Sequence, residues 1–216
     1  MAQDRVGLAP VTWTLPATRP RKGGARVGVL AVQGDFLEHQ IILDSLGAET
    51  VPVRLPRDLD GLQALVLPGG ESTTMVKLLD AFELRAPLKE RIDSGTPVWG
   101  TCAGLILLAR ELQEDRPEPL GVMDIRVSRN AYGRQVDSFE TDISVPSLGE
   151  APFHAVFIRA PAILETGPDV EVLASLPEGG PVAARQGTVL VTAFHPELTP
   201  DTRFHAYFLG MAAGQV

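Results

Sequence analysis

Short apolar runs alternate with segments of helical periodicity through the first half of the chain. Continuous apolar runs predict buried strands, and apolar residues three and four positions apart predict amphipathic helices. The expected strands are 26–34, 50–55, 64–70 and 97–101, and the expected helices are 36–47, 72–95 and 103–113. Strands that alternate with helices in this way are typical of a parallel sheet covered by helices.

The second half of the chain has a different pattern. Apolar and polar residues alternate there between turn signals, which predicts antiparallel or mixed strands within 120–145, 153–164, 170–176 and 181–195. A last amphipathic helix is expected at 202–213. The fold class predicted is therefore α/β, with a mostly parallel central sheet flanked by helices and additional antiparallel strands in the second half. We expect a single domain at 26–216, preceded by a segment, 1–25, whose composition rich in Pro, Arg and Gly predicts disorder.

Composition and charge narrow the function classes. Hydrophobic residues make up 44% of the 216 residues, enough for a core, and the net charge of −8 argues against a nucleic-acid partner. No apolar run approaches the roughly 18 residues of a membrane helix, and the first 25 residues lack the apolar region of a secretory signal. We therefore expect a cytoplasmic protein. One cysteine and four scattered histidines predict neither a disulfide nor a metal site.

The single cysteine, Cys102, lies in the pattern Gly-x-Cys-x-Gly where a predicted strand meets a predicted helix. This is the thiol counterpart of the nucleophile elbow, and Gly100 and Gly104 allow its tight backbone. The turn would place the thiol at the carboxyl end of the sheet, where open α/β folds bind ligands, and the start of the following helix favours the thiolate. Backbone N–H groups at the turn, including that of Ala103, can face an oxyanion. The alternative is an inert, buried cysteine.

A thiol nucleophile needs a base, and the base needs an orienting group. An apolar strand at 188–194 delivers His195, followed by Pro196 and Glu197. Residues two apart share one face of an extended chain, and the proline keeps this segment out of a helix. We therefore expect the carboxylate of Glu197 to lie beside the imidazole of His195, fix its tautomer and support its positive charge.

The other three histidines are weaker candidates. His39 and His205 lie in predicted helices, where surface or packing roles are the default. His154 precedes a strand and has no carboxylate nearby at a useful spacing.

The segment 65–73, Leu-Val-Leu-Pro-Gly-Gly-Glu-Ser-Thr, reads as a strand, a turn and a helix start. The structural interpretation is a turn with Ser72 or Thr73 as the helix cap. The functional one is a flexible Gly69–Gly70 peptide whose N–H groups point into the crevice at the carboxyl end of the sheet. Since this turn and the cysteine elbow are consecutive strand–helix turns, we expect them to be neighbours in the sheet.

Together these segments resemble the class I, triad-type glutamine amidotransferases, and among them the glutaminase subunits of pyridoxal 5′-phosphate synthases. The segments that carry the resemblance are AVQGDFLEH, LPGGESTTM, GTCAGLILLA, SRNAYGRQVDSFE, VFIRAP and FHPELTPDTRFH. The similarity runs from about residue 26 to the C-terminus, and the chain departs from the family by an N-terminal extension of about 25 residues, which the family does not need.

The resemblance implies a flavodoxin-like fold and a role for each matching residue. Cys102 would attack the side-chain amide of L-glutamine, His195 would pass the thiol proton to the departing ammonia, and Glu197 would orient His195. Backbone N–H groups of Gly70 and Ala103 would bind the oxyanion. The implied substrate-binding residues are Gly70, Glu71, Ser72, Arg129, Ile158 and Arg159. An arginine suits the carboxylate of an amino acid because it binds bidentately, although a solvated surface arginine is the structural alternative.

Free ammonia must be consumed nearby, and nothing in the sequence predicts an acceptor site or a second domain. A partner polypeptide is therefore expected, and the resemblance implies the synthase subunit, a TIM-barrel protein, in a large hetero-oligomer. Pyridoxal phosphate would be the partner's product, so no cofactor is expected here. Two alternatives stay open: a stand-alone cysteine hydrolase acting on γ-glutamyl or other amide substrates, and a binding module in which Cys102 is a redox-sensing thiol or a core residue.

Overall fold

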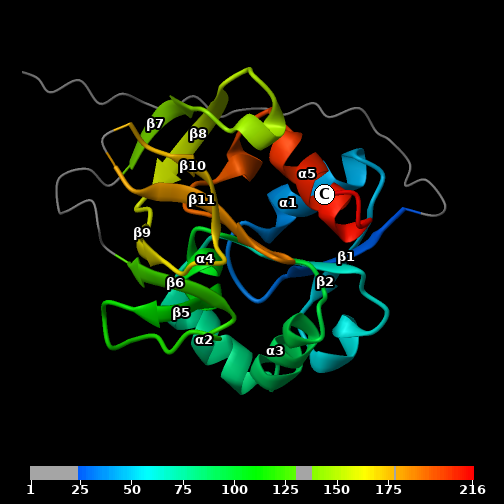
Figure 1. Cartoon of the computed structure of the whole chain (residues 1–216). Coiled ribbons are helices and arrows are strands. Elements are labelled where there is room, and N and C mark those ends of the chain that lie inside the picture. Colours follow the sequence, from blue (N-terminus) through cyan, green and yellow to red (C-terminus); the bar gives the residue numbers. More distant parts are fainter. Residues whose placement is uncertain (1–23, 130–137, 178) are drawn as a thin grey trace, which may run out of the picture.

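The computed structural model describes residues 24–129, 138–177 and 179–216. Nearly all of the 1–25 segment and the residues next to Arg129 in the SRNAYGRQ motif lie outside the described residues. The centre of the fold is a seven-stranded sheet in the order β10-β11-β12-β4-β3-β1-β2 (Figure 1). Its strands are β1 (Arg26–Leu30), β2 (Glu49–Val53), β3 (Ala64–Leu67), β4 (Val98–Thr101), β10 (Glu171–Ser175), β11 (Pro181–Gln186) and β12 (Val189–Thr192).

The five strands from β2 to β12 are parallel, and β11 and β10 extend the sheet in antiparallel fashion. Helices α1 and α5 lie together on one face of this sheet, and α2 and α3 lie on the other (Figure 1). The helices are α1 (Phe36–Ser45), α2 (Ser72–Ala81), α3 (Arg85–Asp93), α4 (Ala103–Leu108) and α5 (Arg203–Ala212), with short 3-10 turns at Pro56–Leu59, Pro146–Leu148 and Pro196–Leu198. The predicted fold class is confirmed.

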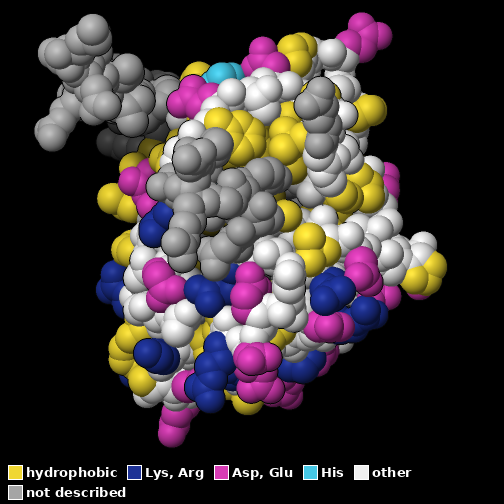
Figure 2. All heavy atoms as spheres, turned by 90° about the vertical axis from the view of Figure 1, so that its left-hand side faces the viewer, with side chains coloured by type: hydrophobic (Ala, Val, Ile, Leu, Met, Phe, Trp, Pro, Cys, Tyr) yellow, Lys and Arg dark blue, Asp and Glu magenta, His cyan; other side chains and the backbone are white. Residues whose placement is uncertain are grey.

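Two small sheets complete the described part of the chain. One contains β5 (Ala109–Leu112), β6 (Met123–Ser128) and β9 (Ala162–Thr166), and the other is the hairpin-like pair β7 (Ser138–Ile143) and β8 (Phe153–Ile158). The second half of the chain is therefore mixed in strand direction, as its alternating pattern predicts. On the face shown in Figure 2, Lys and Arg side chains interleave with Asp and Glu rather than forming a basic stripe.

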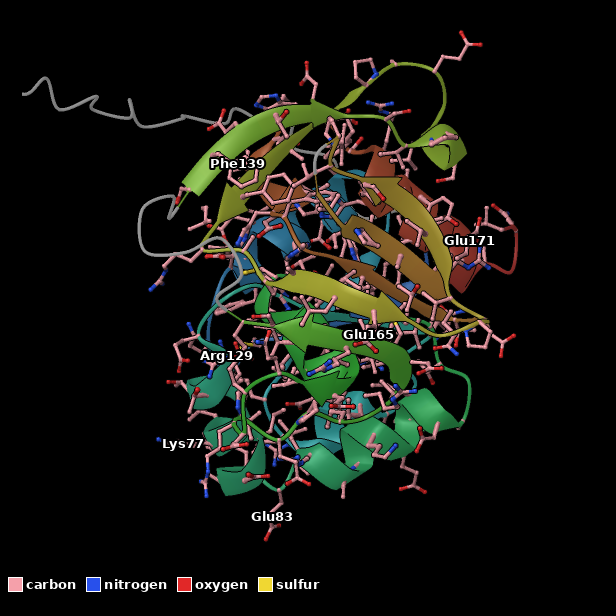
Figure 3. The ribbon with its side chains drawn as sticks, turned by 60° about the vertical axis from the view of Figure 1, so that its left-hand side comes forward. Lys77, Glu83, Arg129, Phe139, Glu165 and Glu171 are labelled. Carbon is pink, nitrogen blue, oxygen red and sulfur yellow. The ribbon has the colours of Figure 1, made fainter. Side chains whose placement is uncertain are left out.

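Two helix predictions are wrong in their extent. The helix expected at 72–95 is divided into α2 and α3 at Glu83, which has a φ of 55° and lies at the turn between them (Figure 3). The cause is Pro87, because in one continuous helix its ring would clash with the carbonyl of Glu83, four residues earlier. In α3 the same proline lies in the first turn, where it is tolerated.

The helix expected at 103–113 ends at Leu108, and Ala109–Leu112 forms β5 instead. By periodicity alone, the apolar run in this segment fits a helix or a strand equally well. The parallel pairing of β5 with β6 decides the outcome, since it gives these backbone groups partners that the sequence pattern does not reveal.

The carboxyl ends of four adjacent strands, β12, β4, β3 and β1, meet at one edge of the central sheet. Each strand there is followed directly by residues with chemically useful groups: His195, Cys102, the Gly69–Gly70 turn, and Gln33 with Asp35. The predicted neighbourhood of the cysteine elbow and the glycine turn is confirmed, because β3 and β4 pair in parallel. No helix among the described residues is long and apolar enough to cross a membrane.

Candidate active site

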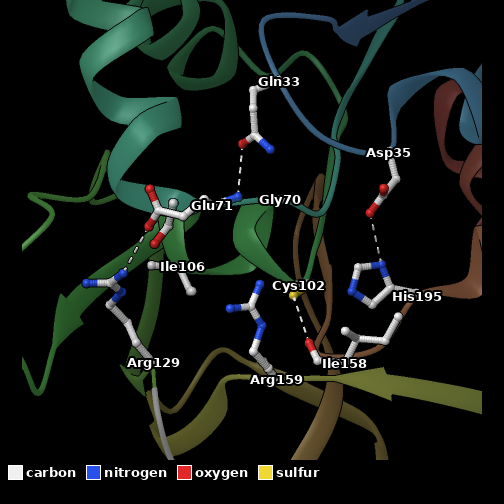
Figure 4. A pocket seen from close by; sticks show the side chains of 11 residues that line it. Gln33, Asp35, Gly70, Glu71, Cys102, Ile106, Arg129, Ile158, Arg159 and His195 are labelled. Carbon is white, nitrogen blue, oxygen red and sulfur yellow. Dashed lines mark hydrogen bonds and ion pairs between the residues drawn. The ribbon is translucent and has the colours of Figure 1, made fainter. Parts of the chain in front are cut away.

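Cys102 lies on a strained backbone turn between β4 and α4. Its φ of 47° and ψ of −101° are unusual for a residue with a side chain, and strain of this kind concentrates at functional sites. The Cys102 amide donates to Thr192 O of β12 at 2.8 Å, which fixes the turn. The thiol lies 3.9 Å from the Ile158 carbonyl oxygen, a weak contact that leaves the sulfur facing the pocket (Figure 4). The predicted elbow is thus present.

The two glycines that flank the elbow are needed for packing. A Cβ at Gly104 would collide with the backbone carbonyl of Leu67 in β3, and a Cβ at Gly100 would collide with the backbone of Gly104. Ala103, the first residue of α4, is only 1% exposed. The first amides of a helix have no acceptor within the helix. The backbone N–H of Ala103 therefore makes no hydrogen bond inside α4 and can donate to a ligand.

His195 and Glu197 are in contact, as predicted, but on a different backbone from the one expected. His195 Nδ1 lies 2.7 Å from Glu197 Oε1, while Pro196–Leu198 forms a 3-10 turn rather than an extended segment. Proline suits the first position of a helical turn, because its fixed φ is already helical. The side chain of His195 is 4% exposed and that of Glu197 is 0% exposed. The His195 amide donates to Val156 O of β8 at 2.8 Å.

The electrostatics of His195 favour its charged form. Burial lowers the pKa of His195, but hydrogen bonding to Cys102 and Glu197 and their negative charges outweigh burial and raise it to about 10. Burial raises the pKa of Glu197, while the hydrogen bond from His195 opposes that rise. With Nδ1 held by Glu197, Nε2 is the nitrogen left for the thiol. The arrangement can therefore hold a thiolate beside an imidazolium.

Two histidines that the sequence did not single out lie directly behind this pair. His39 of α1 and His205 of α5 are 0% exposed and both pack against Trp99, so of the two expected roles, surface or packing, the structure shows packing. His39 Nδ1 lies 3.0 Å from His205 Nε2, and His39 Nε2 lies 3.3 Å from Glu197 Oε2. A helical histidine gives no sign in the sequence of which distant residue it will meet.

The glycine turn after β3 leads into a capped helix. The carboxylate of Glu71 accepts hydrogen bonds from the amides of Thr73, at 3.0 Å, and Thr74, at 2.6 Å, so Glu71 is the cap of α2 in place of Ser72 or Thr73. Burial raises the pKa of Glu71, but these hydrogen bonds outweigh it and lower the pKa to about 2. The side-chain oxygen of Gln33, after β1, accepts from the Glu71 amide at 2.9 Å (Figure 4).

Arg129 is bound to neighbouring groups. Its guanidinium contacts Glu71 Oε1 at 3.3 Å, Thr73 Oγ1 at 3.2 Å and the Arg116 carbonyl oxygen at 2.9 Å. The structure therefore brings together Arg129 and Glu71, two of the implied substrate-binding residues, and pairs the arginine with the acid. Figure 3 shows Arg129 on the side of the molecule that carries α2.

Arg159 differs from Arg129. Its backbone φ is 43°, a second strained position at the same pocket, and its guanidinium points into that pocket (Figure 4). Among the described residues it makes no hydrogen bond or ion pair. The pocket has a volume of about 390 Å³, within the range of small-molecule sites. Its lining comprises Gln33, Asp35, Gly70, Glu71, Ser72, Cys102, Ile106, Arg129, Ile158, Arg159 and His195.

All but two of the predicted site residues line this pocket. The exceptions are Ala103, buried below the elbow, and Glu197, buried behind His195. The sequence did not indicate three lining residues: Gln33, Asp35 and Ile106. Gln33 and Asp35 come soon after β1, and their place at the carboxyl end of a parallel strand is the signal that could have identified them.

Asp35 lines the pocket and faces His195 (Figure 4). Its Oδ2 lies 3.5 Å from His195 Nδ1, the nitrogen already bonded to Glu197. Potential ligand atoms of Asp35, His195 and Glu197 lie within 4.8 Å of one another, the one such grouping among the described residues. A cation there would displace the hydrogen bond between His195 Nδ1 and Glu197 Oε1 that orients the ring. The contacts of His195 with the two acids therefore explain why these three residues lie together. The absence of a metal site stays a prediction.

His154 does have carboxylate partners, contrary to expectation. In the β7–β8 pair, its Nδ1 lies 2.9 Å from Asp142 Oδ1 and its Nε2 lies 3.0 Å from Glu140 Oε2. The partners come from the opposite strand, since Asp142 is directly across from His154, and spacing along one strand does not reveal them.

Comparison with known proteins agrees with this geometry. Residues 29–213 match the SNO glutamine amidotransferase family. A protein of Herpetosiphon aurantiacus named pyridoxal 5′-phosphate synthase subunit PdxT is 61% identical over 188 residues, which cover 86% of this chain and 99% of the relative. A protein of the same name from Acidothermus cellulolyticus is 55% identical over 208 residues, 94% of this chain and 98% of the relative.

Solved structures give the same result. One described as a glutamine amidotransferase superposes with a TM-score of 0.81 at 50% identity and covers 87% of this chain and 98% of that one. The structure of PurLQS from Thermotoga maritima has a TM-score of 0.62 at 16% identity, covering 89% of this chain and 96% of that one, and shows a likeness of fold alone.

Proposed function

The chain belongs to the SNO glutamine amidotransferase family, and we propose that Cys102, His195 and Glu197 form its catalytic triad. It is a glutaminase subunit of pyridoxal 5′-phosphate synthase: it hydrolyses L-glutamine to L-glutamate and ammonia, and the ammonia supplies the synthesis of pyridoxal phosphate. The observation that supports the triad most strongly is the strained Cys102 turn opening on the same pocket as a His195 held 2.7 Å from a buried carboxylate.

In the first half of the reaction, the Cys102 thiolate attacks the side-chain carbonyl carbon of glutamine. The tetrahedral intermediate collapses as the C–N bond breaks, and the His195 imidazolium gives its proton to the departing ammonia. A γ-glutamyl thioester on Cys102 results. Glu197 keeps His195 in the tautomer and orientation that this proton transfer needs.

In the second half, water attacks the thioester carbonyl while neutral His195 takes up its proton. The C–S bond breaks, glutamate leaves, and the thiolate–imidazolium pair is restored. In both halves a negative charge develops on the carbonyl oxygen. The backbone N–H groups of Ala103 and Gly70 bind this oxyanion, which is supported by their positions at the elbow and at the turn after β3.

The two arginines have different roles in binding glutamine. Arg159 binds the α-carboxylate, because its guanidinium is unpaired among the described residues and points into the pocket. The Glu71–Arg129 ion pair forms the wall beyond it, and the carboxylate of Glu71 favours the substrate's ammonium group. Gly70, Ser72 and Ile158 complete the lining against which the substrate's chain lies.

A separate synthase subunit receives the ammonia. We infer that this partner is a TIM-barrel protein, that the two assemble into a large hetero-oligomer in the cytoplasm, and that docking activates the glutaminase. Residues 26–216 then act as one glutaminase domain. Ammonia released into water without a partner would be lost to protonation and diffusion, which favours a glutaminase that is only weakly active until it docks.

The test is glutamine-dependent ammonia release by wild type and by Cys102→Ala, each with and without the synthase subunit. We expect release from wild type only, and much more of it when the partner is present. Release by Cys102→Ala would exclude Cys102 as the nucleophile. Full wild-type rates without the partner would favour a stand-alone amide hydrolase.

A further inference from the structure

One oxygen of the proposed triad has no hydrogen bond among the described residues. Glu197 Oε1 binds His195, but Oε2 accepts no hydrogen bond although Glu197 is 0% exposed in its side chain. A buried carboxylate oxygen without a donor is costly, and a carboxylate bound at one oxygen only can rotate. The group that faces this oxygen therefore determines how firmly the triad is held.

That group is His39. Its Nε2 lies 3.3 Å from Glu197 Oε2 and 3.2 Å from Thr101 Oγ1, and Thr101 is the residue directly before Cys102. One ring on α1 thus touches both halves of the proposed machinery: the strand end that carries the nucleophile and the turn that carries the acid. These two segments are more than ninety positions apart in the sequence.

The buried pair His39 and His205 is neutral. Burial lowers the pKa of His39 well below its usual value, with further lowering by the charges of His205 and His195. Burial lowers the pKa of His205 to about 3. Each ring then carries one N–H, and Trp99 holds both rings, with edge contacts whose centroid distances are 5.5 Å to His39 and 4.9 Å to His205.

The carboxylate of Glu197 selects one arrangement of these two protons. If His39 carried its proton on Nδ1 and donated to His205, its bare Nε2 would face the carboxylate, and the N–H of His205 at Nδ1 would be a buried donor with no partner. If His39 carries its proton on Nε2, that N–H donates to Thr101 Oγ1 at 3.2 Å and lies beside Glu197 Oε2, with 3.3 Å between Nε2 and Oε2, while His205 donates from Nε2 to His39 Nδ1. This arrangement leaves the Thr101 hydroxyl hydrogen and His205 Nδ1 without partners, but an N–H rather than a lone pair then faces the carboxylate oxygen, which is the cheaper arrangement.

We propose that His39 is a positioning residue for the triad: its Nε2–H, fixed by His205, donates to Thr101 beside the Cys102 elbow and attracts the second oxygen of Glu197, which lies 3.3 Å from Nε2. The proposal rests on the proposed function and adds to it a residue that touches neither substrate nor thiol. The titratable groups that face Glu197 here are His195 and Asp35, while those that face His39 are Glu197, His195 and His205.

The sharpest test compares His39→Gln with His39→Asn. Both are polar and of similar size, but the amide nitrogen of glutamine reaches the place of Nε2, and that of asparagine reaches only the place of Nδ1. The readout is the rate of alkylation of Cys102 by iodoacetamide at neutral pH in the full-length chain, which reports one site because the sequence holds one cysteine. His39→Leu, which has no donor, completes the series.

We expect His39→Asn and His39→Leu to lower the alkylation rate about tenfold or more, and His39→Gln to retain most of it. With the synthase subunit present, kcat for glutamine should fall in the same order while KM stays within about twofold, since His39 does not line the pocket. His154→Leu is the matched control, because it removes another histidine bound to carboxylates, and it should leave alkylation unchanged.

Equal rates for the Gln and Asn variants would overturn the proposal, as would a folded Leu variant that alkylates like wild type. Thermal melting of each variant establishes that it is folded. If the Leu variant is unfolded, the comparison of His39→Gln with His39→Asn still tests the proposal. The alkylation readout needs neither glutamine nor partner. Failure of the proposed function, seen as no ammonia release from wild type in the complex, is thus distinguishable from failure of this inference.

Discussion

Two histidines of this protein are bonded to carboxylates, and they lie in opposite surroundings. His195 and Glu197 are buried at the carboxyl end of the central sheet, with a separation of 2.7 Å between Nδ1 and Oε1. His154 lies between Asp142 and Glu140 on the β7–β8 pair, where its side chain is 50% exposed. Both histidines have raised pKa values, yet they differ in what fixes them.

The difference shows that contact with a carboxylate does not by itself make a histidine chemically useful. At the surface, water competes for both partners, and such pairs contribute about 0–1 kcal/mol. In the interior, the orientation is fixed by packing and by further hydrogen bonds, here from α1 and α5, and removal of one partner leaves an uncompensated group. Burial and a second layer of hydrogen bonds distinguish the candidate triad from its surface counterpart.

The largest effect is expected from breaking the buried pair. Glu197→Gln keeps the shape but removes the charge and allows the wrong tautomer of His195, so kcat for glutamine should fall about 10²–10⁴-fold in the complex. Asp142→Asn makes the same chemical change beside His154 and should leave kcat unchanged. Steady-state ammonia release measures both. Near-normal turnover by folded Glu197→Gln would show that the carboxylate does not orient the base.

The pH dependence of turnover sharpens the comparison next. Because the pKa of His195 is raised to about 10, the imidazolium that protonates ammonia persists through neutral pH and is lost as the pH rises through about 10. The alkaline limb of kcat/KM, which reports the free enzyme, should lie there. In Glu197→Gln the limb should move to lower pH, since an anion that stabilises the imidazolium has gone. A limb that stays in place in the variant would contradict the assignment.

Substitutions of the two arginines at the pocket should distinguish the residue that binds glutamine from the residue that supports the pocket wall. Arg159→Gln removes a guanidinium that has no partner within the described part of the chain, and we expect KM for glutamine to rise about tenfold or more with a smaller change in kcat. Arg129→Gln breaks the pair with Glu71 at 3.3 Å, and its effect on KM should be several-fold smaller. Steady-state kinetics of the two variants in the complex decide the order. A larger KM for the Arg129 variant would reverse the assignment.

The smallest effect is expected at His154. Its pKa is raised, first by the hydrogen bond with Asp142 and then by that with Glu140. A histidine whose pKa is raised in the folded protein stabilises the fold fully at a pH below the pKa of the unfolded chain, about 6.5. This stabilisation is lost as the pH rises through the pKa of the folded protein. His154→Gln should therefore lower the unfolding free energy at about pH 5.5, by roughly 0.5 kcal/mol or less, and not at about pH 9. Denaturant unfolding at the two pH values measures this, and a larger loss at the higher pH would contradict it.

The parts of the site that could be predicted from the sequence are local in the chain. The elbow at Cys102 and the His195–Glu197 spacing each occupy a few residues after an apolar strand, and parallel strands bring such turns together at one edge. The break at Glu83 could also have been found, because Pro87 forbids a continuous helix across it.

The remaining features depend on contacts between distant segments. His39 and His205 are 166 positions apart, and neither helix pattern reveals that the two rings meet below the triad. The partners of His154 depend on the register of β7 against β8, and β5 depends on pairing with β6. Arg129 and Arg159 look alike in the sequence, and the contacts of Arg129 with Glu71, Thr73 and Arg116 distinguish them only in the fold.

The central claim is that Cys102 is a nucleophile aimed at glutamine bound in this pocket. Its most direct test is labelling of the full-length chain, with the synthase subunit present, by a glutamine analogue that carries an electrophile at the side-chain carbonyl, followed by mass spectrometry. We predict one label per chain, on Cys102, formed rapidly and suppressed by excess glutamine. Labelling that is absent, that falls on another residue, or that glutamine does not suppress would contradict the account.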